Sequence, residues 1–162
     1  MAAHVYSEIF LHYTWHVADD QPVLTAAVEP FVHNNIRNRC RQTKGVFFHE
    51  IGGTETHVHL AVQIEPFVCI SEFIGDLKGA NEFETNKHFN EKILIWQRGY
   101  GVVSFGKLNL PWVLAYIINQ KEHHAKGSTV ARLEMAEAFA SPAEAGLKDE
   151  IGDSLPPPEG GV

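Results

Sequence analysis

Two short residue patterns in this chain could together form a metal site with a nucleophile beside it. His57 and His59 are two positions apart in the strand-like run 56–64, so both imidazoles point from the same face of a strand. Tyr116 and Gln120 are four positions apart in a helix-like run, so the phenol and the carboxamide lie about one turn apart. If the two faces meet, we expect one divalent ion bound by His57, His59 and Gln120, with Tyr116 next to it. Such a site suits the cutting and rejoining of a nucleic-acid backbone.

The chemistry of this residue set explains the interpretation. Two imidazoles and an amide are neutral ligands that would leave positions open on Mg²⁺ or Mn²⁺ for phosphate oxygens, and the ion would then act as a Lewis acid. A tyrosine phenol has an ordinary pKa of about 10 and needs an ion or a base nearby to become a nucleophile. Each pattern alone also fits an ordinary role, with the histidines as surface groups, Tyr116 at the edge of the core and Gln120 in water.

The composition is that of one soluble globular domain. The chain has 162 residues, of which 44% are hydrophobic and 20% are charged. No apolar run approaches the roughly 20 residues of a membrane-spanning helix, and no secretory signal is recognisable, so we expect no membrane association. Two cysteines, Cys40 and Cys69, do not indicate a disulfide framework, and a reducing cytoplasm fits them better.

The negative charge of the chain is concentrated at its C-terminal end. Residues 133–162 hold seven acidic residues against Lys148 alone, whereas the formal net charge of the whole chain is −7. The sequence therefore predicts a domain over 1–132 and an acidic, Pro- and Gly-rich tail over 133–162 that is disordered at least in part. The domain itself is nearly neutral, so binding to phosphates would depend on local basic patches.

The order of the expected elements predicts an α+β fold. Apolar periodicity and turn residues give the order β-α-β-β-α-β-α, with strands over 7–16, 46–51, 56–64 and 102–105 and helices over 25–44, from 71 onwards and from about 109 to 126. Gly52-Gly53 reads as a turn. Split β-α-β units of this kind predict a ferredoxin-like (RRM-like) antiparallel sheet with helices packed on one side. The strand over 7–16 carries bulky residues on both faces, which suggests an exposed edge available for pairing.

An ordered series of motifs over about residues 6–127 resembles the single-tyrosine HUH transposases, the insertion-sequence 200-like group that includes the REP-associated tyrosine transposases. The motifs are Gly53-Thr54-Glu55-Thr56-His57-Val58-His59-Leu60, Ile74-Gly75-Asp76-Leu77-Lys78-Gly79, Trp96-Gln97-Arg98-Gly99-Tyr100-Gly101, and Tyr116-Ile117-Ile118-Asn119-Gln120 followed by His123-His124. Any one of them is unspecific, and the set in this order is typical of the family.

This resemblance implies a reaction, a site and partners. His57, His59 and Gln120 correspond to the metal ligands of the family and Tyr116 to its nucleophile. The family cleaves hairpin-containing single-stranded DNA, forms a 5′-phosphotyrosine and rejoins strands by reversal, with no nucleotide cofactor. It also implies a homodimer whose active sites are shared between subunits. Thr56 stands where many members have an acid, which leaves the ligands intact but bears on target choice.

Several assignments remain open at the level of sequence. Candidate DNA contacts are Lys78, Arg98, Arg37, Arg41 and His124. Tyr13 and Tyr100 are competing nucleophiles that fit structural roles better, and His12 and His16 share a strand face but lie about 13 Å apart, too far for one ion. A relative that grips hairpin DNA without transposing it, and a phosphoesterase that uses water as nucleophile, are the alternative functions. A DNA substrate would place the protein in the cytoplasm, associated with the nucleoid when bound.

Overall fold

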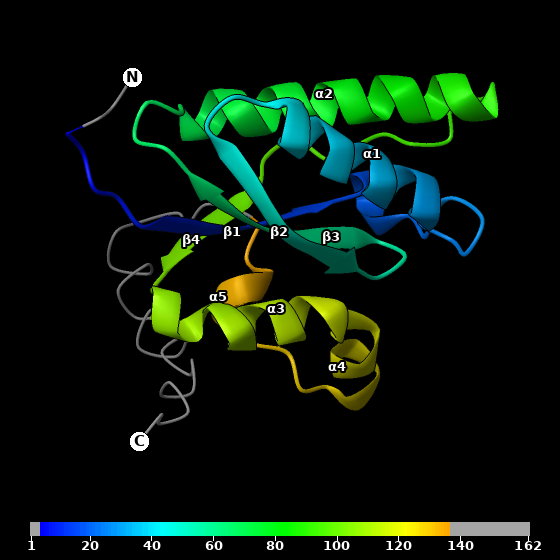
Figure 1. Ribbon diagram of the computed structural model, residues 1–162. Coiled ribbons are helices and arrows are strands. Elements are labelled where there is room, and N and C mark those ends of the chain that lie inside the picture. Colours follow the sequence, from blue (N-terminus) through cyan, green and yellow to red (C-terminus); the bar gives the residue numbers. More distant parts are fainter. Residues whose placement is uncertain (1–3, 137–162) are drawn as a thin grey trace.

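The computed structural model describes residues 4–136, which form a four-stranded antiparallel sheet covered by helices (Figure 1). The elements are β1 (Ile9–His16), α1 (Glu29–Gln42), β2 (Val46–Gly53), β3 (His57–Ile64), α2 (Ile70–Phe89), β4 (Gly101–Phe105), α3 (Leu110–Ile118), α4 (Gln120–Lys126) and α5 (Ala131–Glu134). The strand order is β2-β3-β1-β4, with β3 and β4 both paired to β1. The predicted α+β, ferredoxin-like sheet is confirmed.

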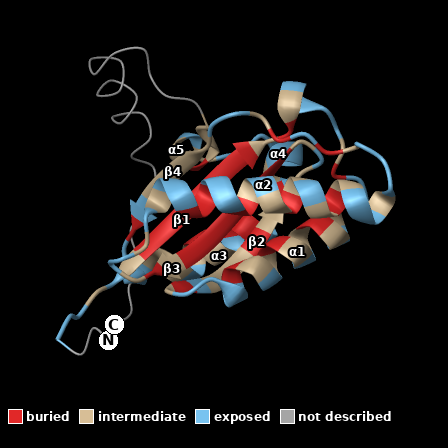
Figure 2. Ribbon diagram, turned by 90° about the horizontal axis from the view of Figure 1, so that it is seen from above, coloured by how far each residue is buried: buried red, intermediate tan, exposed pale blue. Residues whose placement is uncertain are grey.

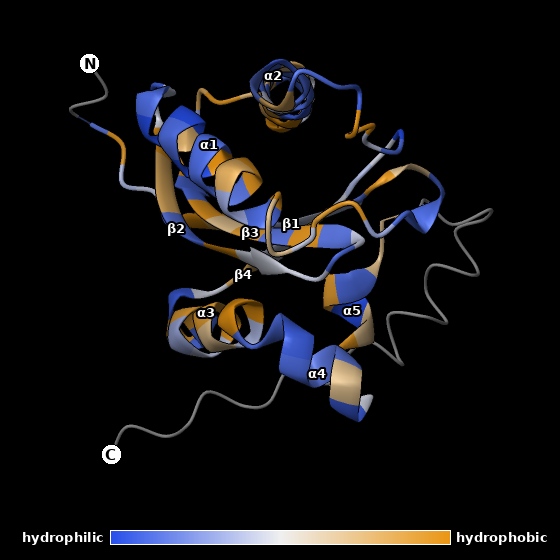
Figure 3. Ribbon diagram, turned by 90° about the vertical axis from the view of Figure 1, so that its right-hand side faces the viewer, coloured by the Kyte–Doolittle hydropathy of each residue, from blue (hydrophilic) through white to orange (hydrophobic). Residues whose placement is uncertain are grey.

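Helices cover both faces of the sheet, whereas the sequence led us to expect them on one side. The helices α1 and α2 lie on one face, and α3, α4 and α5 lie on the other (Figures 1 and 3). The second face needs this cover because it has an apolar patch of its own. Phe10, Ala61 and Phe105 on the strands form a small cluster with Val113 and Ile117 of α3. Burial of that patch holds α3 against the sheet.

The larger core lies between the sheet and the first helix layer. Val58, Leu60 and Val62 of β3 point into it and are completely buried. Tyr13 and Trp15 of β1 join them, and the central strands are buried along most of their length (Figure 2). Because side chains alternate along β3, its apolar residues point into the large core, and His57 and His59 point to the opposite face.

The position of β1 corrects one expectation from the sequence. This strand is in the middle of the sheet and is paired on both sides, so it has no exposed edge. Its residues are bulky on both faces because both faces are covered by helices. The edges of the sheet are β2 and β4. The bulky pattern over 7–16 is thus no evidence for pairing between chains.

Two other elements differ in extent from the prediction. Gly52 and Gly53 belong to β2 instead of forming a turn, and the turn to β3 follows them. The predicted last helix is divided into α3 and α4, since Asn119 departs from helical geometry with a ψ of 21°. Tyr116 and Gln120 consequently lie on either side of a helix break.

Regular structure continues past the predicted domain boundary at residue 132. The short helix α5 spans that boundary, and Leu133 within it is only 1% exposed. The rest of the predicted disordered tail, from 137 to 162, lies outside the described residues. Among the helices of residues 4–136, none has both the length and the apolar character needed to cross a bilayer.

A glycine at the contact between β2 and α3 generates a test of this packing. A Cβ at Gly52 would lie 2.1 Å from the backbone oxygen of Ile117. We expect Gly52→Ala to force α3 from the sheet and to lower the free energy of unfolding by about 1–3 kcal/mol, measured by urea denaturation. The control is Gly79→Ala on α2, where no atom lies within 4 Å, and it should stabilise the protein by up to about 1 kcal/mol. An unchanged midpoint for Gly52→Ala would contradict the close approach.

Candidate active site

His57 and His59 lie on the same face of β3, as predicted, and the Nδ1 atom of each ring has a polar partner. The Nδ1 of His57 is 3.0 Å from the hydroxyl oxygens of both Thr54 and Thr56, in the turn before the strand. The Nδ1 of His59 is 2.8 Å from Nε2 of His12, which projects from β1. When each Nδ1 carries the proton and donates it to these partners, each Nε2 lone pair is available for a metal ion.

Burial keeps His59 and its partner His12 in the neutral form. His59 is completely buried, and this desolvation lowers its pKa to about 4 although Glu134 opposes the effect. His12 is also buried, which moves its pKa well below the ordinary value and leaves it neutral. The Nε2 of His57 is buried and makes no hydrogen bond among the described residues, although the Glu134 carboxylate lies 3.4 Å from it. A buried nitrogen without a hydrogen bond is costly, and a divalent ion at that point would satisfy it.

Tyr116 on α3 faces the same side of the sheet and reaches this pair of histidines. Its side chain is 2% exposed, and its ring centroid lies 6.0 Å from that of His59. The ring is stacked between Trp112 at 5.6 Å and His123 at 4.7 Å, which fixes its direction. Burial raises the pKa of the Tyr116 phenol, so the hydroxyl is protonated at neutral pH.

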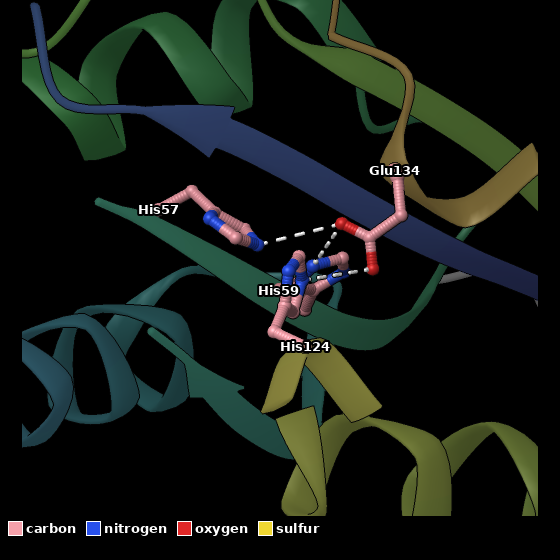
Figure 4. A group of neighbouring side chains, drawn as sticks. All are labelled: His57, His59, His124 and Glu134. Atoms are coloured by element: carbon pink, nitrogen blue, oxygen red, sulfur yellow. Dashed lines mark hydrogen bonds and ion pairs between the residues drawn. The ribbon is translucent and has the colours of Figure 1, made fainter. Parts of the chain in front are cut away.

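Glu134 of α5 brings a carboxylate into the middle of this group (Figure 4). Its Oε2 lies 3.1 Å from Nε2 of His59 and 3.4 Å from Nε2 of His57. Its Oε1 lies 3.4 Å from Nε2 of His124 and accepts a 2.5 Å hydrogen bond from the Tyr116 hydroxyl. One ligand atom from each of His57, His59, His124 and Glu134 falls within 4.8 Å of the others, a spacing compatible with one shared ion.

Gln120, the predicted third ligand, is buried next to this cluster. Its Oε1 lies 3.1 Å from Nε2 of His124, and its Nε2 donates a 3.4 Å hydrogen bond to the backbone oxygen of Tyr116. The amide oxygen of Gln120 is therefore in contact with the imidazole of His124. Metal binding by Gln120 stays a prediction.

The structure distributes the predicted DNA contacts over both faces of the sheet. His124 lies in the metal-binding cluster itself. Lys78 is half buried, and its ammonium donates to the backbone oxygens of Gln97 and Gly99 at 2.7 and 2.6 Å, so it also braces the loop that carries Arg98. Arg37 and Arg41 of α1 lie over the ring of Phe48, on the sheet face opposite Tyr116. All five assignments to DNA remain predictions.

Sequence reasoning missed two residues of the site, His12 and Glu134. The H-x-x-x-H spacing of His12 and His16 argued against one ion shared between them. In the sheet, each of these two residues instead contacts a histidine of β3. His12 is bound to His59, and the ring of His16 is stacked on His57 at 4.7 Å. Glu134 follows the predicted domain boundary in an acidic stretch, and only a fold that returns the chain to the sheet could reveal its role.

Comparison with known proteins identifies the family to which this chain belongs. The family model described as "Transposase IS200 like" matches residues 5–120. No curated protein matches the chain significantly. Among solved structures, a candidate transposase from Deinococcus radiodurans R1 is 21% identical with a TM-score of 0.60, covering 74% of this chain and 96% of that one. A REP-associated tyrosine transposase bound to a REP hairpin is 11% identical with a TM-score of 0.54, covering 80% and 76% respectively. At these identities the two structures support the fold alone.

The buried histidines predict a loss of stability in acid. Burial lowers the pKa of His33 and His59 to about 4 and that of His12 further. Below pH 6.5 these histidines are protonated in the unfolded chain but stay neutral in the folded protein. The free energy of unfolding should therefore fall toward pH 4, by up to about 1.4 kcal/mol per pH unit for each histidine. Thermal denaturation in EDTA from pH 8 to 5 measures this, and His33→Gln should reduce the slope. A melting temperature that is constant from pH 7 to 5 would contradict it.

Proposed function

Because the chain belongs to the IS200-like transposase family, we propose that it cleaves and rejoins single-stranded DNA through a covalent bond to Tyr116, at element ends that contain a hairpin. One observation carries the proposal. The Tyr116 hydroxyl and the Nε2 atoms of His57 and His59 all contact the same carboxylate, Glu134, within 3.4 Å. The candidate nucleophile and two candidate metal ligands therefore point to one place, where a phosphate group could be held between them.

The proposed reaction exchanges one phosphodiester bond for another. The oxygen of Tyr116 attacks the phosphorus as its proton leaves, and the bond from phosphorus to the 3′ oxygen breaks. The 3′ oxygen takes up a proton, and a 5′-phosphotyrosine remains on the protein. A Mg²⁺ or Mn²⁺ ion held by His57, His59 and neighbouring ligands would supply Lewis-acid stabilisation of the phosphate charge. Reversal of the same step joins strands, so no energy source from a nucleotide is needed.

The DNA in this proposal is single-stranded next to a hairpin. A structural neighbour is named as bound to a REP hairpin, and we extend that substrate class to this chain. With an overall charge of −7, binding would depend on local groups, for which Lys78, Arg98, Arg37, Arg41 and His124 are the candidates. A DNA substrate places the proposed activity in the cytoplasm, at the nucleoid.

Two alternatives make different predictions about a covalent product. A domesticated relative would bind the hairpin without forming a link to DNA, and a metal-dependent phosphoesterase would cleave DNA with water as the nucleophile. The stacked and buried setting of Tyr116 beside His59 favours the tyrosine mechanism. Detection of a protein–DNA adduct distinguishes it from both alternatives.

We predict that Tyr116→Phe abolishes adduct formation while fold and DNA binding survive, because only the hydroxyl is removed. The substrate is single-stranded DNA with a hairpin, labelled at its 3′ end, since the 3′ fragment would stay attached to the protein. After incubation with Mn²⁺, a denaturing gel should show a labelled adduct for the wild type and none for Tyr116→Phe or His57→Ala. Tyr100→Phe is the matched control and should form the adduct. A labelled adduct from Tyr116→Phe would show that another residue is the nucleophile.

We further propose that the protein forms a homodimer with active sites shared between subunits, on the ground of family membership. In the structure the site closes within one chain, so sharing requires that equivalent tyrosine helices exchange. Mixing His57→Ala with Tyr116→Phe subunits should then restore adduct formation to about a quarter of wild type, because half of the dimers are mixed and one of their two sites is intact. A monomeric mass in solution would contradict the dimer. Failure of the mixture to recover adduct formation would contradict only the sharing.

A further inference from the structure

Glu134 occupies a position that neither the motifs nor the family resemblance assigns to a ligand. We propose that Glu134 binds the divalent ion in the DNA-free protein and that the scissile phosphate takes its place when DNA binds. This inference rests on the proposed function for the identity of the phosphate, but the ligand assignment stands on the geometry of the site. In the absence of DNA, His57, His59, His124 and Glu134 would then hold the ion together.

The first argument is the charge of the partly buried Glu134 carboxylate. The Glu134 side chain is 18% exposed and is surrounded by imidazoles, and among the described residues it has no salt bridge to lysine or arginine. The Nε2 atoms of His57 and His59 lie 3.4 and 3.1 Å from its Oε2, and Nε2 of His124 lies 3.4 Å from its Oε1. A carboxylate that is enclosed by ring nitrogens and has no lysine or arginine beside it is a favourable place for a divalent cation. A donor set of imidazole nitrogens and a carboxylate oxygen suits Mn²⁺.

The second argument is that Glu134 and a reacting phosphate exclude each other. Oε1 of Glu134 accepts a hydrogen bond from the Tyr116 hydroxyl, and the same oxygen of Tyr116 accepts another from the backbone N–H of Val130 at 2.9 Å. The nucleophile is therefore engaged on both sides by the segment 130–134. A phosphodiester that reached Tyr116 would meet the carboxylate at contact distance, and two anions repel each other there.

The third argument is the way this segment is attached. It is held by the buried side chain of Leu133, by a 2.7 Å hydrogen bond from the Arg132 guanidinium to the backbone oxygen of Ser104, and by close contact at Gly101. A Cβ on Gly101 would lie 1.6 Å from the backbone oxygen of Met135. Departure of the four-residue helix α5 would break these contacts but would leave both core clusters intact, because Leu133 belongs to neither of them.

Calorimetric titration of Mn²⁺ into the DNA-free protein tests the ligand assignment without use of activity. We expect Glu134→Ala to weaken Mn²⁺ binding at least about 10-fold. Glu122→Ala is the control, since that glutamate is exposed and paired with Lys126 on α4. Gly101→Ala should also weaken binding, because it displaces Met135 and the neighbouring Glu134 without removing a ligand. Gly106→Ala, where no atom lies within 4 Å, should bind as the wild type does. Unchanged affinity in Glu134→Ala would overturn the assignment.

The replacement by phosphate is tested with the same titration in the Tyr116→Phe background, which binds DNA without cleaving it. Without DNA, the Glu134→Ala substitution should again weaken Mn²⁺ binding about 10-fold. With saturating single-stranded hairpin DNA, the two affinities should agree within about 2-fold, because the phosphate has taken the position of Glu134. A difference that persists with DNA would overturn the replacement. If wild type binds Mn²⁺ through Glu134 but forms no adduct, the proposed function fails while the ligand assignment holds.

Discussion

The site depends first on the alternation of side chains along β3. Val58 and Leu60 point into the large core, so His57 and His59 must point to the other face of the same strand. That face is covered by α3, and the imidazoles are consequently buried rather than solvated. Their burial is tolerable because each Nδ1 has a partner, the threonine hydroxyls for His57 and His12 for His59. The Nε2 atoms are thereby fixed toward Glu134 before any ion binds, which reduces the cost of ordering them on binding.

The second helix layer brings Tyr116 to the face of the sheet that carries the histidines. In the ferredoxin-like sheet the face opposite α1 and α2 is free, and here α3 fills it by packing Val113 and Ile117 on the strands. Gly52 permits this approach because it has no side chain at the point where the backbone of Ile117 meets β2. Tyr116 lies next to Ile117 on the same helix, so the packing that buries the apolar face also sets the distance from the phenol to the histidines.

The sequence predicted the parts of the site that obey a local period and missed those that depend on tertiary structure. The strand period of two places His57 and His59 together, and helical spacing with an ordered motif series points to Tyr116 and Gln120. The break at Asn119 was not predictable, because nothing between Tyr116 and Gln120 is a strong helix breaker. The central position of β1 was missed because bulky residues on both faces fit an edge strand and a sandwiched strand equally well. Glu134 carries no local signal, since its role depends on Leu133 anchoring α5 to the sheet.

The charge of the site explains how an acidic protein could accept a phosphodiester. In the proposed site the single negative charge of Glu134 offsets part of the charge of the divalent cation, and exchange of that carboxylate for a phosphodiester would leave the formal charge unchanged. The same ion could therefore stay bound when DNA enters, and the net charge of the site would not change. In the proposed exchange, solvation of the displaced Glu134 carboxylate would relieve its repulsion with the DNA. Because the exchange is neutral in charge, it would not require a surface with a large excess of positive charge, which agrees with the formal net charge of −7.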